Sequence, residues 1–216
     1  MSGMIALANS MRQLGQSTVS DVTETNPFVI YRERLDSYSQ AVAAGWSDQQ
    51  FVDLVLRLDK EIETIDGTGF STTPVFDGTE LAAALNLDVQ LNVKVEINSV
   101  GGSHKARHLF GVALHLALGT AAQDVSSRPL AIASCGNAAI AAAIVAKAVK
   151  RPIEVFVPVW AEKAALALLQ ELGAQIQVCE PAASERGDPC YSRFREAVSN
   201  GSHPFVFQGT VTTTAF

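Results

Sequence analysis

The sequence predicts an α/β protein in which helices cover both faces of a parallel β-sheet. From residue 129 onward, short apolar runs alternate with segments of helical periodicity. The runs lack alternating polar residues, which is typical of parallel strands buried between helices. The 216 residues, 48% hydrophobic and 18% charged, are enough to bury a large core.

The first quarter of the chain is predicted to be helical. Ser47 and Gln50 have the spacing of a capping box at a helix start. The helix that follows should bury one apolar face, made of Phe51, Leu54, Val55, Leu58 and Ile62. After the break "DGTGFSTTP", an extended piece at 74–76 and a helix near 79–85 are expected.

Residues 89–97 alternate strictly between apolar and polar, which predicts a strand. The sheet and its covering helices are then expected in this order: helix 104–118, strand 129–133, helix 137–149, strand 153–157, helix 161–172, strand 175–179, helix 189–199 and strand 205–208.

Composition narrows the class of partner. The net charge is −6 and no basic cluster is present, which disfavours nucleic acid. The three cysteines, Cys135, Cys179 and Cys190, are widely spaced, which is typical of a reducing cytoplasm rather than of a disulfide framework. The first residues do not have the pattern of a signal peptide, and the most apolar run is too short for a bilayer. We therefore expect a cytoplasmic protein with a small-molecule or protein partner and no membrane partner.

Two loops lie where ligands bind in parallel sheets, between a strand and the next helix. They are "GGSHK" at 101–105 and "ASCGN" at 133–137. Neither matches the glycine-rich dinucleotide loop, the P-loop or the GxSxG nucleophile elbow.

A metal site is also disfavoured. His104 and His108 have the spacing of the zinc motif HExxH, and His115 falls on roughly the same helical face. However, Lys105 occupies the place of the catalytic glutamate, and an ammonium group beside a dication is electrostatically unfavourable.

Lys105 has two interpretations. It is either an ordinary solvated lysine in the first turn of a helix or a nucleophilic amine, since burial favours loss of its proton and Schiff-base chemistry. The residue alone does not separate the two.

Four segments together carry a resemblance that covers about residues 73–216. They are "TTPVFDGTELAAAL", "LNVKVEINSVGGSHKAR", "AIASCGNAAIAAAIVAKAV" and "PIEVFVPVWAEKAALALLQELGAQI". In this order and spacing they resemble the pyridoxal-phosphate enzymes of the tryptophan synthase β-like family (fold type II). Threonine synthase, serine/threonine dehydratases and cysteine synthases are members.

The resemblance implies pyridoxal 5'-phosphate as cofactor, held by Lys105 as an internal aldimine. Lys105 then acts as acid and base at the substrate Cα and at the cofactor C4′. His104 matches a histidine of tryptophan synthase β that would approach the phosphate, and Asn137 matches the asparagine that binds the cofactor's phenolic oxygen. The loop matching the substrate-carboxylate site consists of Ser134, Cys135, Gly136, Asn137 and Ala138.

The implied function is an amino-acid lyase or synthase, acting by elimination or replacement at Cβ or Cγ, of dehydratase or threonine-synthase type. One alternative is a β-replacement synthase of cysteine-synthase or tryptophan synthase β type. The other is a non-catalytic amino-acid-binding or regulatory module. The sequence departs from the family at Ser99-Val100-Gly101, Ala106, Cys135 and Ala138, which bears on the substrate more than on the cofactor.

The resemblance also divides the chain. Residues 1–97 would be N-terminal helices and the start of a large domain, 98–204 a smaller domain, and 205–216 a return to an incomplete large domain. The family's phosphate loop and pyridine-nitrogen residue are expected after residue 216. Truncation, a second chain and a natural remnant are open explanations, and the chain alone is expected to be inactive. A homodimer, with or without a complementing chain, is the expected assembly.

Overall fold

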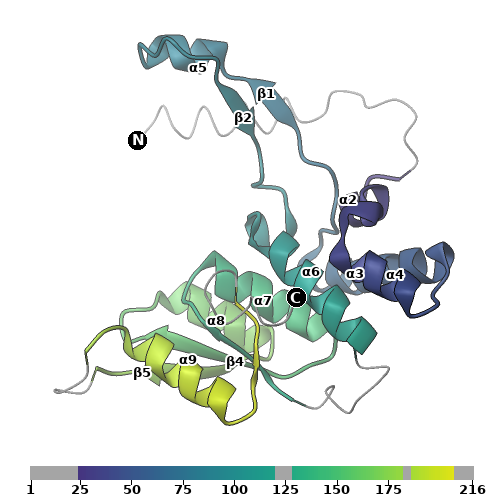
Figure 1. Cartoon of the computed structure of the whole chain (residues 1–216). Helices are drawn as coiled ribbons and strands as arrows, with labels where there is room; N and C mark the ends of the chain where they lie inside the picture. The colour runs from purple at the N-terminus through teal and green to yellow at the C-terminus, as the bar shows by residue number, and fades with distance from the viewer. Residues whose placement is uncertain (1–23, 120–127, 182–185, 207–216) are drawn as a thin grey trace.

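The computed structural model describes residues 24–119, 128–181 and 186–206. Figure 1 shows three parts: a sheet with its covering helices, a group of N-terminal helices, and a hairpin that projects away from both. No helix within the described ranges is long and apolar enough to cross a bilayer.

The main sheet has four parallel strands in the order β5-β4-β3-β6. Its centre is formed by β3 (Leu130–Ala133) and β4 (Ile153–Pro158), and most of their residues are buried. The edges are β5 (Gln175–Cys179) and the short β6 (His203–Pro204). The predicted last strand, 205–208, is therefore misplaced: β6 begins at His203, Phe205 N still donates to Ala131 O (2.8 Å), and residues 207–208 lie outside the described ranges.

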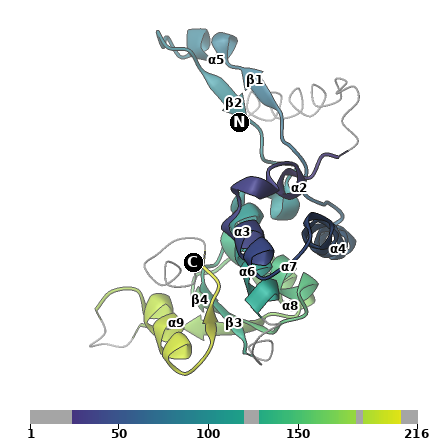
Figure 2. The same cartoon turned by 45° about the vertical axis from the view of Figure 1, so that its right-hand side comes forward.

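Helices cover both faces of this sheet, as predicted. Figure 2 shows α9 (Pro189–Ser199) on one side and α7 (Asn137–Ala148) with α8 (Lys163–Glu171) on the other. α7 is the most buried helix of these three, and its buried residues are chiefly alanines. Small side chains let the helix approach the sheet and neighbouring helices closely, because no bulky group separates the backbones.

The N-terminal helices pack on α6 (Lys105–Gly119) and α7. They are α2 (Pro27–Ile30), the 3-10 turn η1 (Arg32–Arg34), α3 (Asp36–Ala43) and α4 (Asp48–Asp66). The predicted capping box is present at the start of α4: Gln50 N donates to Ser47 Oγ (3.2 Å), and Ser47 N donates to Gln50 Oε1 (2.7 Å). All five residues of the predicted apolar face of α4 are buried.

The strand predicted at 89–97 was wrong in its length and in the sheet to which it belongs. The alternating segment 89–97 forms only a three-residue strand, β2 (Asn92–Lys94), which pairs antiparallel with β1 (Val75–Asp77). This hairpin, with α5 (Thr79–Ala84) at its tip, stands apart from the parallel sheet. Val89 and Ile97 are 58% and 49% exposed. Alternation is typical of an antiparallel strand with one solvent-exposed face, so the sequence indicated the type of strand but not its partner.

The capping box gives a stability test. Ser47→Ala removes the acceptor for Gln50 N and should lower the free energy of unfolding by about 1 kcal/mol, as measured by urea denaturation. Ser39→Ala, at an exposed position in α3, is the matched control and should change it by less than about 0.5 kcal/mol. Equal effects of the two substitutions would contradict a capping role for Ser47.

Candidate functional site

The residues 134–138, here called the carboxylate loop, connect β3 to α7. Ser134 N donates to Phe156 O of β4 (3.2 Å), which fixes the start of the loop beside the neighbouring strand. Gly136 is the N-cap of α7 and makes no side-chain capping hydrogen bond, and no acidic residue lies in the first turn. No capping side chain therefore occupies the N–H groups of this first turn, and the positive end of the helix favours an anion there.

Pockets lie against this loop, as expected for the carboxyl end of a parallel strand. One of about 460 Å³ is lined by Cys135, Gly136 and Asn137, together with Trp160 and residues of α8. Another, of about 310 Å³, is lined by Ser134 and Cys135 on its loop side. Asn137 is exposed, whereas Ala138 packs against the hydrophobic core. The loop thus presents backbone N–H groups and one amide to space that a small ligand could enter.

Lys105 is the first residue of α6 and is separated from the turn η2 (Val100–Gly102) by Ser103 and His104. It is half-buried, and its backbone N lies 3.4 Å from Ser103 Oγ. His104 precedes the helix and is exposed. The expectation that this motif follows a strand of the parallel sheet was wrong, because the preceding strand, β2, belongs to the hairpin.

The turn that precedes α6 is in contact with α7. Gly101 has φ +65°, a left-handed conformation that favours glycine. A Cβ at this position would lie 3.4 Å from Ile144 Cδ1 and 3.6 Å from Ala141 Cα, both on α7. The turn before Lys105 therefore rests on α7 about one helical turn beyond the carboxylate loop.

The carboxylate loop lines the two pockets described above, whereas Lys105 and His104 do not line them. Among the described residues that line the two pockets beside the loop, neither Lys105 nor His104 occurs. Lys105 and the loop are connected instead by the packing of α6 on α7.

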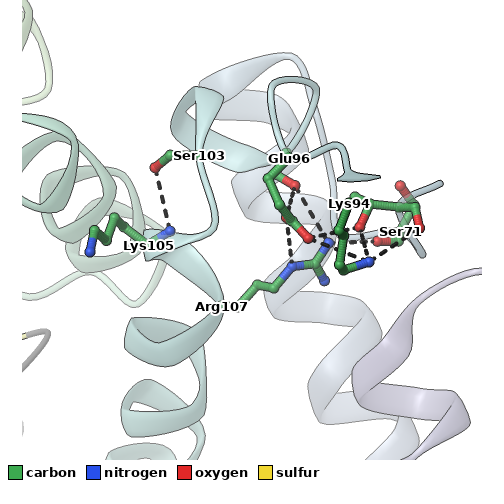
Figure 3. A network of polar contacts seen from close by, with 8 residues as sticks. Ser71, Lys94, Glu96, Ser103, Lys105 and Arg107 are labelled. Atoms are coloured by element: carbon green, nitrogen blue, oxygen red, sulfur yellow. Dashed lines mark hydrogen bonds and ion pairs between the residues drawn. The ribbon is translucent and has the colours of Figure 1, made fainter. Parts of the chain in front are cut away.

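A polar network that the sequence analysis did not identify anchors the first turn of α6. Glu96 accepts hydrogen bonds from Thr73 Oγ1 (2.8 Å), Ser99 Oγ (2.7 Å) and Arg107 Nε (3.1 Å). Arg107 Nη2 also donates to Ser71 O (3.0 Å), and Lys94 Nζ lies 3.5 Å from Glu96 Oε1. In Figure 3, Lys105 extends away from Glu96 and Arg107. The network ties the base of the hairpin to the helix two residues beyond Lys105.

Hydrogen bonds and the Arg107 charge keep Glu96 ionised at neutral pH. Burial opposes its ionisation, but the hydrogen bonds from Ser99, Thr73 and Arg107 outweigh burial and lower the Glu96 pKa to about 2. The charged residues of the motifs Lys-x-Glu at 94–96 and Lys-x-Arg at 105–107 were the available sequence signal. Their mutual contact depends on how the chain folds back, which spacing alone does not give.

The Glu96 pKa is lower in the folded protein than its ordinary 4.5. Ionised Glu96 therefore stabilises the folded protein above pH 4.5, and this stabilisation is lost as pH falls toward 2. Glu96→Gln should lower the free energy of unfolding by roughly 1.5–3 kcal/mol at pH 7, with a smaller difference near pH 2. Urea denaturation from pH 2 to 7 measures this. Glu180→Gln, at an exposed position, is the control, and a wild-type to Glu96→Gln difference that does not change with pH would contradict the network.

The donors present fit pyridoxal 5'-phosphate and an amino acid. A primary amine at the start of α6, an exposed amide at the start of α7 and a helix N-terminus without a capping side chain suit an aldehyde, a phenolate and a carboxylate, respectively. The observation that carries the fit is Gly136, an N-cap with no side-chain bond, which leaves the first turn of α7 able to receive an anion.

Solved structures share this fold at low sequence identity. A pyridoxal 5'-phosphate-dependent aspartate racemase is 21% identical (TM-score 0.53), covering 74% of this chain and 47% of its own. Maize serine racemase is 18% identical (TM-score 0.52), covering 74% and 46%. Diaminopropionate ammonia lyase from Escherichia coli is 17% identical (TM-score 0.52), covering 85% and 43%. The chain thus spans less than half the length of each of these structures.

No curated protein matches the chain. The family model described as "Pyridoxal-phosphate dependent enzyme" matches residues 68–216, which is more than half of the chain. That match includes the hairpin, Lys105, the carboxylate loop and the parallel sheet. The family's cofactor is pyridoxal 5'-phosphate, in agreement with the donors described above. This chain therefore belongs to the pyridoxal-phosphate dependent enzyme family of fold type II.

Proposed function

We propose that the chain supplies the lysine and the carboxylate-binding loop of an amino-acid lyase or synthase acting at Cβ or Cγ. The observation that carries the proposal is the placement of two helix starts. Lys105 begins α6, the carboxylate loop begins α7, and the turn before Lys105 packs on α7 through Gly101. An amine and an anion site held by the same helix pair suit a substrate that carries both an amino and a carboxylate group.

Each residue has a distinct task in this proposal. The bound cofactor supplies an electron sink that makes the substrate's Cα–H acidic. Lys105 would hold the cofactor through Nζ, and its amine would serve as the general base for the Cα proton. The first turn of α7 would bind the carboxylate, and the Asn137 side chain would hold the cofactor's phenolic oxygen by donating a hydrogen bond. His104, exposed just before α6, approaches the phosphate.

The reaction class is proposed as elimination, of dehydratase or threonine-synthase type. A β-replacement synthase is the second candidate, favoured by a structural likeness to O-ureido-L-serine synthase (20% identical, TM-score 0.50, covering 67% of this chain and 42% of its own). The two racemases among the similar structures make racemisation a third outcome that an assay must score.

Cofactor attachment is testable by absorbance. The purified protein, together with any chain that co-purifies, should develop a yellow absorbance band when pyridoxal 5'-phosphate is added, because the cofactor joins Nζ of Lys105. Lys105→Ala should abolish the band, whereas Lys163→Ala, at an exposed position at the start of α8, should leave it unchanged. Bands in wild type and Lys105→Ala alike would refute the role of Lys105. Absence of a band in every sample would favour the non-catalytic module.

The reaction class is tested by product analysis of the protein, together with any chain that co-purifies, with a panel of β- and γ-substituted amino acids. Elimination predicts that ammonia and a 2-oxo acid are released without an added nucleophile. Asn137→Ala should reduce that rate by about 10²-fold, the scale at which positioned groups contribute. Turnover only in the presence of a nucleophile would indicate replacement, and inversion at Cα without ammonia would indicate racemisation.

A further inference from the structure

Trp160 lies just after β4, next to the carboxylate loop. It is 74% exposed, the largest exposed fraction among the large apolar side chains of the described residues. Ala161 N donates to Pro158 O (3.0 Å), which closes a turn that contains Trp160. Ser134 N donates to Phe156 O (3.2 Å), so the end of the same strand also fixes the start of the loop. An exposed indole is thus held on an ordered turn beside the loop.

Trp160 lines both pockets that adjoin the carboxylate loop, and so does Cys135. The pocket of about 460 Å³, here called the loop pocket, also reaches Gly136 and Asn137 at the start of α7. The pocket of about 310 Å³, here called the apolar pocket, extends from Cys135 to the end of β5 and the start of α9. A ligand whose carboxylate lies at the start of α7 can therefore reach the apolar pocket past Cys135 and Trp160.

The walls of the apolar pocket consist mainly of apolar side chains. Besides Trp160 they include Phe156 and Val159. Among the described residues that line this pocket, the charged one is Asp188, and its Oδ1 accepts a hydrogen bond from Cys190 N (2.9 Å) at the start of α9. Such walls favour an apolar group, because its burial removes apolar surface from water. The volume lies at the lower end of the range for small-ligand pockets, about 300–1,000 Å³.

The charges around the two pockets disfavour an anionic side chain on the ligand. In the part of the chain that the structure describes, no Lys, Arg or His lines either pocket. The charged residues that do line them are acidic: Asp188 in the apolar pocket and Glu162 in the loop pocket. A phosphate or carboxylate on the ligand's side chain would lose its hydration and approach these carboxylates, and both effects are unfavourable.

We propose that Trp160 and the apolar pocket form a side-chain subsite that selects amino acids with a neutral, apolar side chain. This subsite rests on the proposed function, because the carboxylate loop must hold the ligand's carboxylate. With the carboxylate held there, the side chain enters the apolar pocket, and the indole of Trp160 packs against it. The substituent that the substrate carries at Cβ or Cγ is therefore neutral and largely apolar, rather than a phosphate or a carboxylate. Trp160 determines specificity and takes no part in proton transfer.

Fluorescence of Trp160 reports binding directly. The chain contains two tryptophans, Trp46 and Trp160, and Trp46 lines neither the loop pocket nor the apolar pocket. Subtracting the emission of Trp160→Phe from that of the wild type, each with any chain that co-purifies, isolates the emission of Trp160. L-Leucine should shift this emission to shorter wavelength in a saturable way, because its side chain displaces water from the indole. L-Serine and O-phospho-L-serine should need concentrations at least about tenfold higher.

Equilibrium dialysis with radiolabelled L-leucine and L-serine measures how much Trp160 contributes to selectivity. Trp160→Ala should weaken leucine binding by about tenfold and should change serine binding much less. Trp160→Phe keeps an aromatic face and should retain most of the affinity for leucine. Tyr191→Ala is the matched control, since it removes an aromatic side chain that is 41% exposed and lines neither pocket. It should leave both affinities unchanged.

The outcomes distinguish this subsite from the proposed reaction, because both binding measurements are made without added cofactor. Selective leucine binding in a protein that forms no yellow band with pyridoxal 5'-phosphate would support the subsite and count against the role of Lys105. Absence of a Trp160 response to leucine would overturn the subsite, whether or not the band forms. Equal affinities for leucine, serine and phosphoserine, or an equal loss of leucine and serine binding in Trp160→Ala, would also overturn it.

Discussion

The close packing of α6 on α7 is the constraint on which the candidate site depends. α7 is buried along most of its length and built largely from alanine, so helices and sheet approach its backbone. Gly101 lies against α7, where a Cβ would be in van der Waals contact with Ile144 and Ala141, and its left-handed backbone favours glycine. The starts of both helices are consequently held at fixed positions, one bearing the Lys105 amine and the other the proposed anion site.

The polar network at Glu96 complements this apolar packing. Packing fixes how closely α6 approaches α7, whereas Glu96 and Arg107 fix the path by which the chain enters α6 from the hairpin. Because Arg107 lies two residues after Lys105, the ion pair and the amine lie in the same helical turn. Charge on Glu96 is therefore linked to the geometry of the site without any contact with a reacting atom.

Local patterns were sufficient to predict most of the sheet region. The apolar runs and helical periods after residue 129 predicted helices and strands whose ends lie within about two residues of the observed ends, apart from the last strand. The capping box at Ser47 predicted the start of α4. Local patterns could not identify the partner of β2. That partner is β1, which α5 separates from β2 in the sequence, and the two strands form a hairpin of their own. The position of the loop 134–138 followed from its place after β3, but the Glu96 contacts required the folded chain.

The central claim is that the amine at the start of α6 is the cofactor's attachment point, and chemical trapping tests it most directly. Borohydride reduction of the protein with pyridoxal 5'-phosphate, together with any chain that co-purifies, would make the linkage permanent, and peptide mapping would locate it. The account predicts a single modified lysine, Lys105, in equal proportion to bound cofactor. Modification spread over exposed lysines such as Lys60 and Lys163, with Lys105 unmodified, would contradict it.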